Sequence, residues 1–269
     1  MRPILTIRSR LLGCIGLALA VFAAACSSGG SSQNQRPVEQ SVANDPDPRA
    51  QAKAHTELAG AYFGLGNVAV ALDEVRIAIA SDPTYAPAHN VQGLVHMELR
   101  ENPQAQASFQ RALSLAPDDP DVNHNYGWFL CQTGRTEQGL TYFNNAIKNP
   151  LYRSPSKSNA QAGMCMLNAK NETEAIRYFD RALKIEPDYT PVMLPYATLL
   201  YSRGEFDASR RFVQRYNELR DPSAESLWLA LRIERRRGDQ AGVASLGAQL
   251  RRRYPASREA QALAQERFE

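Results

Sequence analysis

Six prolines recur at nearly constant intervals, and this regularity limits the possible fold more than any other feature of the sequence. In order they are Pro83, Pro117, Pro150, Pro187, Pro222 and Pro255, and the longest interval lies between Pro150 and Pro187. Because proline cannot continue a helix and disfavours helical backbone at the preceding residue, each is expected to follow the end of a helix. Apolar residues between the prolines recur at helical intervals, and no segment shows the alternation of a strand. The sequence therefore predicts an all-α array of repeats.

The stretch 121–146, DVNHNYGWFLCQTGRTEQGLTYFNNA, shows the residue pattern of one repeat most clearly. It is interpreted as two helices around a turn at 133–136. The pattern consists of Tyr126 and Gly127 in the first helix, and Gly139, Phe143 and Ala146 in the second. The small residues let the paired helices approach closely, and the aromatic ring fills the space between them. This pattern resembles the tetratricopeptide repeat, a helix pair with a period of about 34 residues, which is close to the interval between the prolines.

Corresponding residues along the chain indicate six such units. They are assigned to about 52–85, 86–119, 121–146, 156–189, 190–223 and 224–257. Unit six has the weakest pattern and is identified mainly by its spacing and by Pro255. A helix over 257–268 is expected to cover its open face, as the last unit of an array requires. The predicted fold class is an all-α tetratricopeptide repeat solenoid of six helix-turn-helix units plus a C-terminal capping helix, within a domain of residues 49–269.

The segment 1–25 is interpreted as a secretory signal peptide. Three arginines precede the apolar run 11–25, which is too short to span a bilayer stably and ends in small residues. The run stops at Cys26, and this resembles a bacterial lipobox, although Ala23 stands where Leu is usual. The prediction is cleavage before Cys26 followed by its acylation. The alternative is ordinary secretory cleavage that leaves Cys26 as an unpaired thiol.

Residues 26–48 are expected to form a lipidated cysteine followed by a flexible tether. They are rich in Ser, Gly, Gln, Asn and Pro, so they bury too little apolar surface to offset their ordering entropy. In bacterial lipoproteins an Asp after the cysteine tends to retain the protein in the inner membrane. Ser27 therefore predicts a lipid-anchored protein of the outer membrane that faces the periplasm.

The charge balance does not favour a nucleic-acid partner. The full chain has 31 basic and 28 acidic residues, but the predicted signal peptide carries three of the arginines and no acid. The remaining 28 basic and 28 acidic residues cancel, so the excess of positive charge belongs to the leader. Eight arginines still gather near the end of the chain, between Arg232 and Arg258. Such a run is usually a solvated helix face, and the alternative is a contact with an acidic partner or a lipid head group.

The junction between units three and four has two special features. Cys131 and Cys165 lie one repeat length apart, each towards the end of the first helix of its unit, and first helices of successive units lie side by side. This spacing and an oxidising periplasm favour a disulfide between them, and the alternative is two small buried thiols. The connection 149–158 is also longer than the others, with Leu151 and Tyr152 expected to be exposed. It is either a loop on a binding face or a passive insertion.

No catalytic or metal-binding motif was found. The four histidines include no HExxH, and the chain has no phosphate-binding loop, no GxSxG and no CxxC. The chain is therefore interpreted as a binding scaffold, not an enzyme, with no cofactor, no metal and no small-molecule substrate. First helices of stacked repeats line a concave groove, and the residues predicted to line its partner-binding part are Phe63, Asn90, Leu94, Met97, His124, Trp128, Met164 and Leu167. About half of them are expected to be accessible, because many residues at such positions pack between helices; Leu194, Tyr201 and Trp228 occupy the same positions in later units.

Two stretches are more specific than the repeat pattern: NHNYGWFLCQTGR at 123–135 with the loop LYRSPSKS, and SLWLALRIERRRGD with LRRRYPAS within 226–257. Together with the predicted lipidated cysteine, the tether and the six repeats, they make the whole predicted mature chain resemble the PilF/PilW family of type IV pilus biogenesis lipoproteins. It implies a pilotin-like protein that assists targeting or assembly of the type IV pilus secretin, or stabilises the pilus fibre. Some family members also join the corresponding cysteines in a disulfide. The alternative function is a periplasmic scaffold for envelope or cell-wall assembly enzymes.

Overall fold

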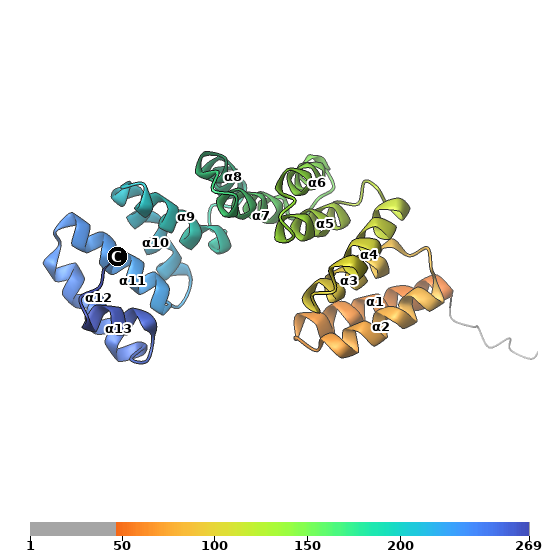
Figure 1. The fold of residues 1–269 in the computed structure, drawn as a ribbon, viewed down its shortest axis with the longest axis horizontal. Coiled ribbons are helices and arrows are strands. Elements are labelled where there is room, and N and C mark those ends of the chain that lie inside the picture. The colour runs from red at the N-terminus through yellow and green to blue at the C-terminus, as the bar shows by residue number, and fades with distance from the viewer. Residues whose placement is uncertain (1–46, 269) are drawn as a thin grey trace, which may run out of the picture. The chain divides into compact units, whose positions relative to one another are not determined.

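The computed structural model describes residues 47–268, and within that range it contains thirteen α-helices and no strand (Figure 1). Twelve of the helices form six consecutive pairs. They are α1 (Pro48–Gly64) and α2 (Val68–Ser81), α3 (Ala86–Glu98) and α4 (Asn102–Leu115), α5 (Pro120–Gln132) and α6 (Thr136–Lys148), α7 (Pro155–Asn168) and α8 (Glu172–Ile185), α9 (Thr190–Ser202) and α10 (Phe206–Leu219), and α11 (Ala224–Arg237) and α12 (Gln240–Arg253). The last helix, α13 (Arg258–Ala264), packs on α11 and α12. The predicted fold class is confirmed: six helix-turn-helix units and a terminal capping helix. The predicted signal peptide, Cys26 and most of the tether lie outside the described residues.

The repeated prolines lie where the second helices end. Helix α2 ends at Ser81 before Pro83, α4 ends at Leu115 before Pro117, and α12 ends at Arg253 before Pro255. Within each pair the turn needs one residue in the left-handed region, which favours glycine. Gly66, Gly134, Gly204 and Gly238 supply it with φ between 77° and 79°, while Arg100 and Lys170 take the same place in units two and four with φ of 61°.

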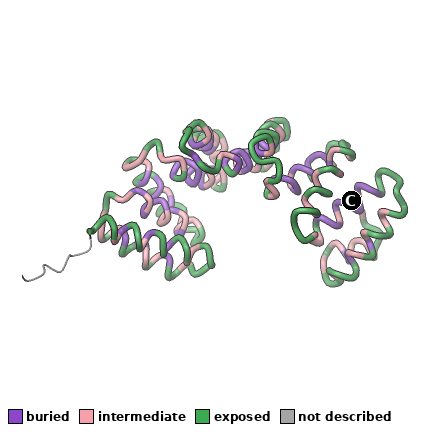
Figure 2. The backbone as a smooth tube through the Cα atoms, turned by 180° about the vertical axis from the view of Figure 1, so that it is seen from behind, coloured by how far each residue is buried: buried purple, intermediate pink, exposed green. Residues whose placement is uncertain are grey.

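Within each of units two, three and four, a glycine in the first helix faces a fully buried phenylalanine in the second. The pairs are Gly93 with Phe109, Gly127 with Phe143, and Gly163 with Phe179. A Cβ atom added to Gly93 or Gly163 would lie 2.6 or 2.5 Å from the ring, so the ring occupies the space that a larger residue would need. These contacts explain why the repeat pattern is strongest in the middle of the chain. Figure 2 shows that the buried residues lie on the helices, while the turns between them are mostly exposed.

Candidate protein-binding surface

The first helices of successive units form the candidate binding surface, which we call the inner face. First helices contact one another from unit to unit, α1 with α3, α3 with α5, α5 with α7, α7 with α9, and α9 with α11. Residues at equivalent positions of these helices therefore recur along one face. Two cavities lined in part by large apolar side chains lie on it, and both include residues that the sequence placed in the groove.

The first cavity lies over units one to three. Phe63 of α1, Leu94 and Met97 of α3 and Trp128 of α5 line a space of about 390 Å³. All four side chains are partly exposed, although each is large and apolar. The rest of the lining is mostly polar and consists of Glu98, Arg100, Asn102, Gln132 and Thr133, together with Phe129. Such an apolar floor with a polar rim suits a helix or an extended segment that inserts apolar side chains.

The second cavity lies over units four and five and has a volume of about 510 Å³. Met164 and Leu167 of α7 line it together with Leu194 of α9. Pro191 and Pro195, also in α9, line the same cavity. Proline lacks a backbone N–H group, so Pro195 cannot donate the helical hydrogen bond to the carbonyl one turn earlier. The groove prediction for unit five named Leu194 but missed the two prolines beside it, although their i,i+4 spacing places them on one side of a helix.

His124 is not available to a ligand on the inner face, contrary to its assignment to the groove. Its side chain is 2% exposed, and its Nδ1 lies 2.7 Å from the hydroxyl of Ser158 in α7. The hydroxyl of Tyr152 lies 2.9 Å from the same Ser158 oxygen. Burial lowers the pKa of His124 to about 3, and it raises the pKa of Tyr152 to about 12. The three residues form a buried network that joins units three and four.

Asn90 is also buried rather than accessible, with 8% of its surface exposed. Its side-chain oxygen accepts a hydrogen bond of 3.2 Å from Asn125 of the next unit. The reason is the same as for His124, because both residues lie near the start of a first helix where the next unit covers them. The long connection follows the prediction only in part. Leu151 is 83% exposed as expected, but Tyr152 is 8% exposed, and α7 already begins at Pro155.

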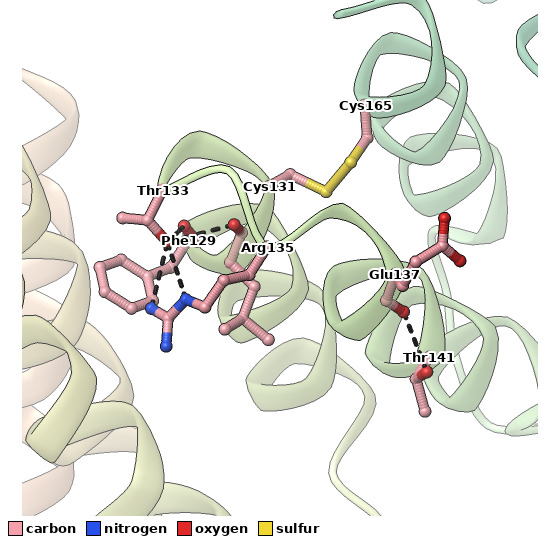
Figure 3. The surroundings of a disulfide bond; sticks show 8 residues. Phe129, Cys131, Thr133, Arg135, Glu137, Thr141 and Cys165 are labelled. Atoms are coloured by element: carbon pink, nitrogen blue, oxygen red, sulfur yellow. Dashed lines mark hydrogen bonds between the residues drawn. A yellow bond between two sulfur atoms is a disulfide. The ribbon is translucent and has the colours of Figure 1, made fainter. Parts of the chain in front are cut away.

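Cys131 and Cys165 are joined in the structure by a disulfide that links α5 to α7 (Figure 3). Their Cα atoms lie 5.7 Å apart. Cys131 is one helical turn beyond Trp128 of the first cavity, and Cys165 follows Met164 of the second. Trp128 and Met164 pack against the same buried cluster. The disulfide therefore links α5, which contributes Trp128 to the first cavity, covalently to α7, which contributes Met164 to the second.

The described part of the chain holds no cluster of three or more His, Cys, Asp or Glu side chains arranged to bind a metal ion. Among helices α1 to α13, none is both long and apolar enough to cross a membrane. What the inner face offers chemically is apolar surface, hydrogen-bonding rims and, in unit six, positive charge.

Comparison with known proteins agrees with this architecture. Models of the tetratricopeptide repeat match residues 86–119, 108–141 and 166–232. The type IV pilus assembly protein PilF of Pseudomonas aeruginosa is 28% identical over 257 residues, which covers 96% of this chain and 98% of the relative. Its solved structure has a TM-score of 0.73 at 29% identity and covers 81% of this chain and 99% of that one. The crystal structure of PilW, a widely conserved type IV pilus biogenesis factor, has a TM-score of 0.72 at 28% identity, covering 79% and 98%.

The six helix pairs and the matching models define a tetratricopeptide repeat protein. Within that class the similarity to PilF and PilW extends over nearly the whole length of those proteins. The chain is therefore similar to PilF and PilW in both sequence and fold.

Proposed function

We propose that this chain is a non-catalytic outer-membrane lipoprotein that acts as a pilotin or assembly scaffold for type IV pili. Acyl chains on Cys26 anchor it, and its inner face binds the pilus secretin or another protein of the pilus machinery. The proposal draws on the similarity to PilF and PilW, whose names state a role in pilus assembly and biogenesis. The leader and Ser27 support the membrane location.

The first cavity is the main structural support for the proposal. Three consecutive units contribute four large apolar side chains to one site, and all four remain partly exposed. Keeping such groups in water is unfavourable by about 25 cal/mol for each Å² of apolar surface, so covering them with a partner favours association. Trp128 is the expected anchor, because tryptophan dominates the binding energy of many interfaces. The expected ligand is an amphipathic helix or an extended apolar segment of the partner.

A deletion strain complemented with variants tests this proposal. Trp128→Ala and Leu94→Glu should each prevent secretin multimers from forming or reaching the outer membrane. A loss of binding energy of about 2 kcal/mol lowers affinity about 30-fold. The readout is a blot for the secretin under conditions that keep its multimer intact, with surface pili counted in parallel. Ile77→Glu is the matched control, because Ile77 is an exposed apolar residue of the second helix α2 and lines neither cavity.

Two outcomes would contradict the proposal in different ways. Normal secretin multimers in the deletion strain, with pili lost, would exclude secretin assembly and favour a role in fibre stability. Normal pili combined with envelope defects would favour the scaffold for cell-wall or envelope enzymes instead. The anchor has its own test, in which Cys26→Ala should leave the domain folded but shift it out of the membrane fraction. Unchanged fractionation of that variant would contradict lipidation at Cys26.

A further inference from the structure

The last unit of the inner face differs from the others because it carries arginines and is already covered by a segment of the same chain. Residues 266–268 follow α13 and lie against α11. The ring of Phe268 stacks on Trp228, with ring centres 5.5 Å apart and planes 17° apart. The guanidinium of Arg235 lies 3.6 Å from the centre of the Phe268 ring. The aromatic side chain is thus held between an indole and a cation.

The backbone of this segment is held too. The Nε group of Arg232 donates a hydrogen bond of 3.1 Å to the carbonyl oxygen of Phe268, and the Arg232 guanidinium lies 4.4 Å from the centre of the Tyr201 ring. Arg236 donates from Nε to the hydroxyl of Tyr201 at 3.4 Å. Tyr201 belongs to α9 and the arginines belong to α11, so the contacts bridge units five and six.

A space of about 450 Å³ remains beside these groups, lined by the three arginines, Tyr201, Glu266 and Phe268. In the described part of the chain, Arg232, Arg235 and Arg236 form no ion pair, whereas the next residue, Arg237, pairs with Asp207. Three guanidinium groups that have no ion pair with any residue the structure describes surround a partly open space, and they attract negative charge. Glu266 already lines that space two positions before the aromatic ring.

We propose that unit six holds a second binding site, specific for a protein segment with an acidic residue two positions before an aromatic residue. Trp228 and Arg235 bind the aromatic ring, Arg232 binds the backbone carbonyl that follows it, and the remaining positive charge of the site binds the acidic side chain. Residues Glu266–Phe268 occupy the site in cis, and the partner segment displaces them. This site is independent of the apolar cavities and of the proposed role in pilus assembly.

The test uses a fluorescein-labelled peptide of residues 262–268, amidated at its end, and fluorescence polarisation with the full folded chain. Phe268→Ala should vacate the site and raise the affinity for the peptide about tenfold over the native chain, because a tethered occupant competes at an effective concentration near the millimolar range. Adding Arg235→Glu to that variant should abolish binding. Adding Arg252→Glu, a charge change on an exposed arginine of α12, should leave it intact. A peptide in which alanine replaces the phenylalanine should not bind.

A second variant guards against a folding defect in the first. A chain that ends at Gln265 keeps every helix, so circular dichroism should show native helix content while peptide binding rises as for Phe268→Ala. If neither variant binds the peptide more tightly than the native chain, residues 266–268 are a structural cap and the proposal is wrong. It is also wrong if Arg252→Glu weakens binding as much as Arg235→Glu, since the attraction is then unspecific. Tighter, Arg235-dependent binding of anionic phospholipid vesicles that displaces the peptide would assign the site to a membrane surface instead.

Discussion

Units three and six fill the space between their paired helices in opposite ways. In unit three the small residue is Gly127 of the first helix, and the large one is Phe143 of the second. In unit six the equivalent residues are Leu231 and Gly247, so the large side chain has moved to the first helix. Phe143 and Leu231 are both fully buried. The repeat therefore requires a combined size across the two helices and not a fixed residue at either position.

The two units also differ in what covers the start of their first helices. In unit three His124 is covered by the next unit, through its contact with Ser158 of α7. In unit six the equivalent residue is Trp228, and no further unit follows in the described chain, so Phe268 stacks on it. An internal unit can therefore bury a polar group by pairing it with its neighbour, whereas the last unit uses an aromatic contact.

The largest expected difference between the two regions comes from the disulfide of unit three. Cys131 and Cys165 have a sequence separation of 34, and a closed loop of that length stabilises the folded state by about 4 kcal/mol through the entropy of the unfolded chain. We expect dithiothreitol to lower the thermal midpoint of the native chain by several degrees. Circular dichroism with and without the reductant gives the shift.

The double variant Cys131→Ala/Cys165→Ala is the control for this measurement. The thermal midpoint of this variant should be lower than that of the oxidised native chain, and dithiothreitol should not change it, because the variant has no disulfide to reduce. Peptide mapping under non-reducing conditions checks the pairing in the mature protein. Free thiols at both positions in protein purified without reductant would contradict the disulfide between units three and four.

A smaller effect on stability than that of the disulfide should follow when alanine replaces the glycine between the paired helices of each unit. A Cβ at Gly127 would lie 2.9 Å from the carbonyl oxygen of Gly139 and 3.2 Å from the Phe143 ring, so the two backbones must move apart. Gly127→Ala should cost about 2 kcal/mol, as overpacking typically does. At Gly247 the nearest atoms are side-chain methyls of Leu263 and Leu231 at 3.3 and 3.5 Å. Gly247→Ala should be neutral or stabilise by about 0.5 kcal/mol, since alanine favours helix.

Urea denaturation of the two alanine variants measures this difference. Equal destabilisation by the two substitutions would mean that unit six is packed as tightly as unit three. The different placement of the large and small residues would then not affect how well each unit accepts a methyl group. Destabilisation by Gly247→Ala alone would mean that unit six is the more tightly packed of the two.

The fold could be predicted from the sequence because its signals are local. The prolines, the turn glycines and the glycine–phenylalanine pairs each depend on spacing along one helix pair. Unit six was the weakest prediction because the pattern expects a small residue where Leu231 stands. The pattern expects a large residue in the second helix, and Gly247 stands there. Each residue taken alone therefore departs from the pattern, although the two together fill the same space.

The candidate site was harder to predict, because accessibility depends on the neighbouring unit. Spacing places Trp128 and His124 on the same face of α5, one turn apart. Trp128 remains partly exposed in the first cavity, while α7 buries His124. Nothing in a single repeat distinguishes these two positions. The role of Phe268 was missed for the same reason, since its contacts with Trp228 and Arg235 lie far away in the sequence.

The dependence of stability on pH should distinguish the buried network between units three and four from the rest of the chain. Burial keeps His124 neutral in the folded protein because its pKa is lowered from 6.5 to about 3, whereas the unfolded chain takes up a proton below about pH 6.5. The full contribution of His124 to stability is therefore present above pH 6.5 and is lost progressively as the pH falls towards 3. Between pH 7 and pH 5.5 the expected loss is about 1 kcal/mol. Urea denaturation at both values measures it, and His124→Gln should remove this part of the dependence while the other three histidines remain. If the pH dependence is the same in His124→Gln as in the native chain, the pKa of His124 does not differ between the folded and the unfolded chain. Water would then reach the histidine at the junction of units three and four.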